Sequence, residues 1–118
     1  MKIIKKNPPR KFKVGLEQSI ILKDCGDIFL KVNEQVAFLT ANKAEYDVCR
    51  KEWGYYATPS MNDRLKRFGF KTALVKNAKG QLYIMIVEKD KLESFYQYLN
   101  SEKNSVIQWF DEQALENA

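Results

Sequence analysis

The stretch that decides the fold is Phe70-Lys-Thr-Ala-Leu-Val-Lys76, followed by Asn77-Ala-Lys-Gly80 and Gln81-Leu-Tyr-Ile-Met-Ile-Val87. Two apolar runs separated by a short polar loop that ends in glycine predict a β-hairpin. The second run is apolar at nearly every position. We therefore expect it to be a central strand of a sheet, covered on both faces.

Downstream of this hairpin, a helix is expected to begin at Asp90. The apolar residues at helical spacing are Leu92, Phe95, Tyr96 and Leu99. This spacing predicts one apolar stripe that packs against the sheet. A last strand is predicted at Val106-Ile-Gln-Trp-Phe110, and residues 113–118 are expected to form a frayed tail.

Upstream, three further strands are expected, at residues 19–22, 28–32 and 36–39. The first two are separated by Asp24-Cys-Gly-Asp27, and a tight hairpin turn needs the positive φ that Gly26 adopts readily. The sequence therefore predicts a hairpin centred on this turn.

Two helices are expected between these strands and the hairpin at residues 70–87. Asn42 and Glu45 form a candidate capping box, and residues 43–53 read as the first helix, which Gly54 ends. Ser60 is a candidate N-cap of a second, short helix that runs to Phe68. The resulting element order is βββααββαβ.

This order predicts the α+β class. Because most strands follow one another in hairpins, we expect an antiparallel or mixed sheet with helices packed on one face. The 118 residues fit one compact domain, which we place at residues 14–112, and 45% of them are hydrophobic. The chain can therefore bury a core without a metal or a disulfide.

Composition narrows the chemistry. The chain has no histidine, so it lacks the commonest general base and the commonest transition-metal ligand. Its two cysteines, Cys25 and Cys49, are 24 positions apart and are expected to be free thiols. We predict no catalytic residue, no metal and no cofactor. Lacking a membrane-spanning apolar run and a secretory signal, the protein is expected to be cytoplasmic and to have no membrane partner.

Positive charge is concentrated in two places. Residues 1–13 carry six basic residues, no acidic residue and the pair Pro8-Pro9, so they are predicted to form a flexible basic arm. Residues 50–71 carry six basic residues and two acidic residues. A local positive patch of this kind favours an anionic partner.

The second patch also holds aromatic and hydroxyl side chains, and it forms the candidate ligand-binding site. Its proposed members are Trp53, Tyr55, Tyr56, Thr58, Ser60, Asn62 and Arg64. Free amides at the start of the helix after Ser60, together with the Arg64 guanidinium, suit phosphate or carboxylate. The aromatic rings suit stacking on a base or a sugar. The same residues also fit a purely structural reading, with rings at the core rim, Ser60 as a cap and Arg64 on a solvated helix face.

One resemblance bears on the fold. At Glu52-Trp-Gly-Tyr-Tyr-Ala-Thr-Pro-Ser60 and Gly69-Phe-Lys-Thr-Ala-Leu-Val-Lys-Asn77, the chain resembles a family of small bacterial proteins of about this length and of unknown function. The resemblance continues at Val87-Glu-Lys89 and Trp109-Phe-Asp-Glu112. It implies a compact α+β fold and assigns no catalytic residue.

Three functions remain open on the sequence. The first is a non-catalytic binding or accessory module for an anionic small molecule, such as a nucleotide or a sugar phosphate. The second is a nucleic-acid-binding protein that uses the basic arm and the patch at residues 50–71. The third is a homodimer or interaction protein that needs no ligand.

Overall fold

The computed structural model describes residues 1–113. These residues form eight strands and several short helices, which confirms the predicted α+β class. The elements are β1 (Lys2–Val14), β2 (Ile20–Phe29), β3 (Gln35–Leu39), β4 (Glu45–Lys51), β5 (Gly54–Ala57), α1 (Arg64–Arg67), β6 (Phe70–Lys76), β7 (Leu82–Glu88), the 3-10 turn η1 (Lys89–Lys91), α2 (Leu92–Glu102), β8 (Ser105–Trp109) and α3 (Phe110–Gln113). The strands form three small sheets, ordered β1-β2, β3-β4-β5 and β7-β6-β8. Apart from Gln113, the tail expected at residues 113–118 lies outside the described residues.

Backbone contacts group the chain into two compact units. Unit 1 comprises Met1–Val36 and Val48–Tyr56, and unit 2 comprises Ala37–Asp47 and the chain from Ala57 onward. Each unit has its own sheet, β1-β2 in unit 1 and β7-β6-β8 in unit 2. The boundaries fall inside the range 14–112, which the sequence assigned to one domain.

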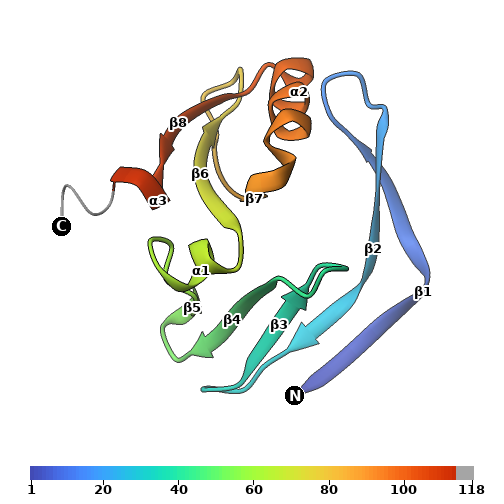
Figure 1. Ribbon diagram of the computed structural model, residues 1–118. Helices are drawn as coiled ribbons and strands as arrows, with labels where there is room; N and C mark the ends of the chain where they lie inside the picture. The colour runs from blue at the N-terminus through green and yellow to red at the C-terminus, as the bar shows by residue number, and fades with distance from the viewer. Residues whose placement is uncertain (114–118) are drawn as a thin grey trace. The chain divides into compact units, whose positions relative to one another are not determined.

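The sheet of unit 2 contains the hairpin predicted at residues 70–87. β6 and β7 pair antiparallel from Phe70 opposite Glu88 to Lys76 opposite Leu82, which confirms the hairpin and its register-setting loop. The expectation that the second strand is central was wrong, because β6 lies between β7 and β8 (Figure 1). The apolar run in β7 does not reflect burial on both faces, since Leu82 is 59% exposed at the sheet edge.

One face of this sheet is closed by α2. Ala73 and Val75 of β6 are fully buried on that face, together with Leu99 of α2, and Phe95 packs against the same cluster. The apolar stripe predicted for this helix is therefore confirmed at Phe95 and Leu99, whereas Tyr96 is exposed. The helix proper begins at Leu92, because the residues after Glu88 first form the 3-10 turn η1.

The opposite face of the sheet carries a second cluster. Thr72 lies across the ladder from Ile86, and alternate residues of a strand share a face, so Phe70 points the same way. Phe70 and Ile86 pack with Leu65 of α1 and with Ala44. The two helices α1 and α2 therefore lie on opposite faces of this sheet, whereas the sequence predicted one covered face.

The helix predicted at residues 43–53 is not formed, and β4 takes its place. Asp47 and Cys49 are buried while their neighbours are half-buried, which is the period of a strand and not of a helix. Asn42, expected to cap a helix, lies in the turn after β3. There, the amide of Ala44 donates to the Thr40 hydroxyl at 3.2 Å, and the amide of Lys43 donates to the Thr40 carbonyl at 2.9 Å.

Residues 1–13, expected to be a flexible arm, form strand β1, which pairs antiparallel with β2 in unit 1. The pairing is interrupted between Lys5, opposite Gly26, and Arg10, opposite Asp24. The Pro8-Pro9 pair lies in this bulge, where the ladder does not require amide donors. The strand therefore accommodates the two residues that the sequence analysis treated as strand breakers.

The hairpin turn predicted at residues 24–27 is also absent, because β2 runs unbroken through it. Gly26 has a φ of +153°, and a Cβ atom there would collide with the carbonyl oxygen of Ile4. Glycine is needed at this position for the close approach of β1 rather than for a turn.

Candidate functional site

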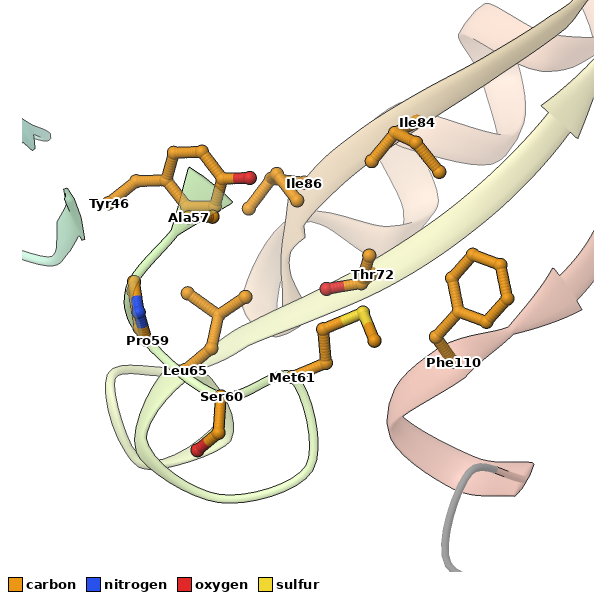
Figure 2. A pocket seen from close by; sticks show the side chains of 10 residues that line it. All are labelled: Tyr46, Ala57, Pro59, Ser60, Met61, Leu65, Thr72, Ile84, Ile86 and Phe110. Atoms are coloured by element: carbon orange, nitrogen blue, oxygen red, sulfur yellow. The ribbon is translucent and has the colours of Figure 1, made fainter. Parts of the chain in front are cut away.

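The candidate site is a cavity of about 430 Å³ on the α1 face of the unit 2 sheet. Strands β4, β6 and β7 line it, together with the end of β5, the segment before α1, α1 itself and the start of α3. The lining residues are Tyr46, Ala57, Pro59, Ser60, Met61, Leu65, Thr72, Ile84, Ile86 and Phe110 (Figure 2). This volume lies within the range of roughly 300–1,000 Å³ that is typical of small-molecule sites.

The segment before α1 is held in place by Arg64. The Arg64 guanidinium donates to the Asp47 carboxylate at 3.1 Å and to the Thr58 hydroxyl at 3.1 Å. The Asp47 side chain is only 4% exposed, so a buried negative charge is compensated by a half-buried positive charge. The Thr58 amide also donates to the Asp47 carbonyl at 2.9 Å. These bonds fix the turn that places Pro59 and Ser60 against the cavity.

The start of α1 is closed by local hydrogen bonds to Ser60. The helix has four residues, Arg64–Arg67, and is shorter than the helix predicted from Ser60 to Phe68. The Ser60 hydroxyl accepts from the Arg64 amide at 2.9 Å, and the Ser60 carbonyl accepts from the Leu65 amide at 2.9 Å. Of the amides that were expected to receive a phosphate, those of Asp63, Arg64 and Leu65 are therefore engaged by Ser60, and the Arg64 side chain is engaged as well.

The polar groups that remain inside the cavity are two neutral hydroxyls. Thr72 is 2% exposed, and its hydroxyl has no hydrogen-bond partner among residues 1–113. Burial raises the pKa of the half-buried Tyr46 phenol, which keeps the ring neutral. Both hydroxyls point toward the middle of the lining residues, whereas the Ser60 hydroxyl points away from it (Figure 2).

A network around Asp111 positions the wall formed by Phe110. Asp111 is buried, and its carboxylate accepts from the Thr72 amide at 3.2 Å and from the Lys71 ammonium at 2.9 Å. Lys71 also donates to Glu112 at 2.6 Å. Burial acts to lower the pKa of Lys71, but the bonds to Glu112 and Asp111 outweigh it and raise that pKa. Lys71 therefore stays charged and ties α3 to β6.

The residues predicted for the ligand site divide between the two units. Thr58, Ser60, Asn62 and Arg64 belong to unit 2, and of these Ser60 lines the cavity. Thr58 and Arg64 are hydrogen-bonded to each other and hold the turn together. Asn62, which lies between them in the sequence, is half-buried.

The three predicted aromatic residues belong to unit 1 and form their own surface group. Trp53 stacks on Tyr56 with ring centroids 6.0 Å apart, and Arg50 lies over the Tyr55 ring at 5.3 Å. Arg50 also donates to the Gly54 carbonyl at 3.1 Å. Trp53 is 72% exposed, so this group is a surface feature of the β4–β5 connection.

The sequence analysis missed Tyr46 and Thr72, the two polar residues that face the cavity. Tyr46 was assigned to a helix that does not form. Thr72 is the one hydroxyl residue in the run Phe70–Val75, which also contains Lys71, and its burial depends on partners that are distant in sequence. The one available signal was this hydroxyl residue in the first strand of the predicted hairpin.

No cluster of His, Cys, Asp or Glu suited to a metal ion occurs within residues 1–113. Within the same range, none of the helices has the length and apolar character needed to cross a bilayer. No family model matches the chain, and comparisons with curated proteins and with solved structures find no match. The resemblance to small bacterial proteins at residues 52–60 and 69–77 therefore stays a prediction.

Proposed function

We propose that this protein is a non-catalytic binding module for a small, uncharged, largely apolar molecule that carries a hydrogen-bonding group. The observation that carries the proposal is the buried Thr72 hydroxyl, which lacks a partner among residues 1–113 and faces an apolar cavity. A buried polar group without a partner costs about 1–3 kcal/mol. A ligand carbonyl, hydroxyl or ether placed against Thr72 would recover that free energy.

The lining of the cavity argues for an uncharged ligand. It holds aliphatic, aromatic and thioether side chains with three hydroxyls, and no lysine or arginine is among its residues. An anion moved from water into such surroundings would lose its hydration without gaining a cation. The proposal therefore keeps the binding role predicted from the sequence and replaces the nucleotide or sugar phosphate with a neutral ligand.

The hydroxyls of Tyr46 and Thr72 favour recognition over chemistry. Each can donate one hydrogen bond and accept others, so together they can orient a carbonyl or an alcohol group. The raised pKa of Tyr46 makes its phenol a poorer source of phenolate at neutral pH, which suits a hydrogen-bond donor.

A thermal-shift screen tests this proposal. The probes are small neutral aromatic and aliphatic alcohols, ketones and esters, with sugar phosphates and nucleotides as the anionic set. We expect stabilisation by neutral probes. Thr72→Val should weaken their binding about 3- to 10-fold, because one hydrogen bond contributes roughly 0.5–1.5 kcal/mol and a tenfold change equals about 1.4 kcal/mol.

A matched pair of variants locates the binding. Ile84 lines the cavity at 57% exposure, so Ile84→Trp can fill it from the surface with little strain. Ile107 is 50% exposed on β8 and does not line the cavity, so Ile107→Trp is the control. Ile84→Trp should abolish the thermal shift and Ile107→Trp should preserve it. Stabilisation by phosphates alone, or equal effects of the two variants, would refute the proposal.

A further inference from the structure

The strand ribbon of unit 1 carries a group of lysines that form no ion pair among the described residues 1–113. The register of β1 and β2 places Lys11 opposite Lys23 and Lys13 opposite Ile21. Directly opposed residues of a ladder share a face, and alternate residues along a strand do so as well. Lys11, Lys13, Ile21 and Lys23 therefore lie on one face of the ribbon, which we call the lysine face. All four are exposed.

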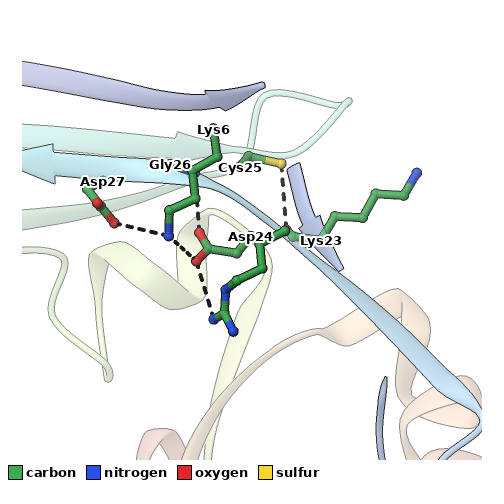
Figure 3. A network of polar contacts seen from close by, with 7 residues as sticks. Lys6, Lys23, Asp24, Cys25, Gly26 and Asp27 are labelled. Atoms are coloured by element: carbon green, nitrogen blue, oxygen red, sulfur yellow. Dashed lines mark hydrogen bonds and ion pairs between the residues drawn. The ribbon is translucent and has the colours of Figure 1, made fainter. Parts of the chain in front are cut away.

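Elsewhere in the ribbon, basic side chains form ion pairs with neighbouring carboxylates. Lys6 forms ion pairs with Asp24 and Asp27, and Arg10 pairs with Asp24 at 3.5 Å (Figure 3). The Lys6 and Gly26 hydrogen bonds and the nearby positive charges keep the pKa of Asp24 below its ordinary value. Lys23 is drawn beside this network with its ammonium group extending away from it (Figure 3).

Like charges placed directly across a ladder destabilise a sheet. Lys11 and Lys23 form such a pair, with Lys13 next to it, and none of the three has an ion-pair partner among residues 1–113. Such a cluster of lysines disfavours folding but concentrates positive charge. It is expected where an external anion binds and offsets that charge.

We propose that the lysine face binds the phosphate backbone of nucleic acid, without reading its sequence. The occupant follows from charge and shape. Lysine ammonium groups are compact point charges with three donors each, suited to phosphate oxygens. Alternate lysines on a strand are about 6.8 Å apart, and paired strands are about 4.8 Å apart, so the ribbon presents a narrow row of charges. A two-stranded ribbon is narrow enough to enter a major groove.

Two other occupants are less well matched to this face. An anionic membrane would reward several apolar side chains beside the lysines, and of the four residues that define the lysine face Ile21 alone is apolar. Specific base readout would call for arginine, asparagine or glutamine near the lysines, and the face has none of these. Backbone binding needs only the charges that are present.

Fluorescence anisotropy with a short labelled DNA duplex of mixed sequence, titrated between about 50 and 200 mM salt, measures this binding. The test variant is Lys11→Gln/Lys13→Gln/Lys23→Gln. The control is Lys2→Gln/Lys5→Gln/Lys31→Gln, which removes the same charge from the other end of the ribbon and the loop after it. Each lost phosphate contact lowers the slope of log affinity against log salt by about 0.9, so the test variant should lose roughly 2–3 units of slope. The control should lose less than about 1 unit.

The outcomes separate binding from folding. Removing the Lys11–Lys23 repulsion should leave the test variant at least as resistant to urea as the native chain, so a lost slope is not a lost fold. Equal slopes for the two triple variants, absent duplex binding, or binding only to vesicles that contain phosphatidylserine would each overturn the proposal. Ile84→Trp, which tests the ligand cavity, should leave duplex binding unchanged. The two proposals therefore fail independently.

Discussion

The guanidinium of Arg64 and the carboxylate of Asp47 form an ion pair at 3.1 Å, in which the carboxylate is almost fully buried. The pair joins β4 to the first residue of α1 and leaves Arg64 little freedom to bind an external anion. Arg64 is thus best understood as a residue that builds the cavity wall.

Arg64→Ala should lower the free energy of unfolding by about 2–4 kcal/mol. Removing one partner of a buried pair leaves the other charge uncompensated, and the half-buried position of Arg64 keeps the effect toward the lower end. Urea denaturation measures the change. Arg64→Ala/Asp47→Asn should recover part of the loss, since the second substitution removes the buried charge. Additive losses in the double variant would show that the two side chains do not interact.

Thr72→Val should raise the free energy of unfolding of the ligand-free protein by about 1 kcal/mol. Valine has nearly the same shape and lacks the hydroxyl that has no partner among residues 1–113. Thr58→Val is the contrasting variant, because the Thr58 hydroxyl accepts from Arg64 and its removal should destabilise the protein. Urea unfolding of both variants provides the comparison. A destabilised Thr72→Val would mean that its hydroxyl already has a partner.

Gly26→Ala should destabilise the β1–β2 ribbon by about 2–3 kcal/mol, since it adds backbone strain and a collision with the Ile4 carbonyl. Gly54 is a matched control in the same unit. Its φ of +147° is similar, but a Cβ atom there would meet nothing within 4 Å. Hydrogen exchange of the β1 and β2 amides should rise markedly in Gly26→Ala and much less in Gly54→Ala. Equal effects of the two substitutions would mean that the positive φ alone, and not the collision with Ile4, destabilises Gly26→Ala.

The free energy of unfolding should fall at alkaline pH because of Tyr46. Burial raises the pKa of Tyr46 in the folded state above its ordinary value of about 10. The folded state then binds more protons than the unfolded state between these two pKa values. Stability is therefore kept below about pH 10 and lost as the pH rises through the folded pKa. Tyr46→Phe should remove this part of the alkaline loss, as measured by urea unfolding at several pH values.

Local sequence patterns were sufficient to predict an element where residues that are near in sequence bury one of its faces. The hairpin at residues 70–87 and the helix at 92–102 follow from apolar periodicity and a glycine-ended loop, and both are formed. The element at residues 43–53 could not be assigned in this way, because its spacing also fits a helix. What distinguishes the strand is the burial of Asp47 against Arg64, 17 positions away.

The candidate site was only partly accessible to sequence reasoning for the same reason. The sequence analysis singled out the turn at Thr58-Pro-Ser60, and in the structure Pro59 and Ser60 line a cavity. The Arg64 amide is occupied by the local partner Ser60, but whether the Arg64 guanidinium is free depends on a tertiary partner, and here Asp47 engages it. The hydroxyl of Thr72 becomes notable only once β6, β7 and the segment before α1 surround it.

The two prolines in the bulge of β1 have a consequence for how the molecule behaves in a crowded solution. The β1–β2 sheet has two strands, so the outer side of β1 is an open edge within the described part of the chain. Proline has no amide hydrogen, so an incoming strand cannot form an uninterrupted ladder past Pro8 and Pro9. The ribbon thereby resists fibril-like stacking with other copies, although Ile3, Ile21 and Phe29 are each more than half exposed along it.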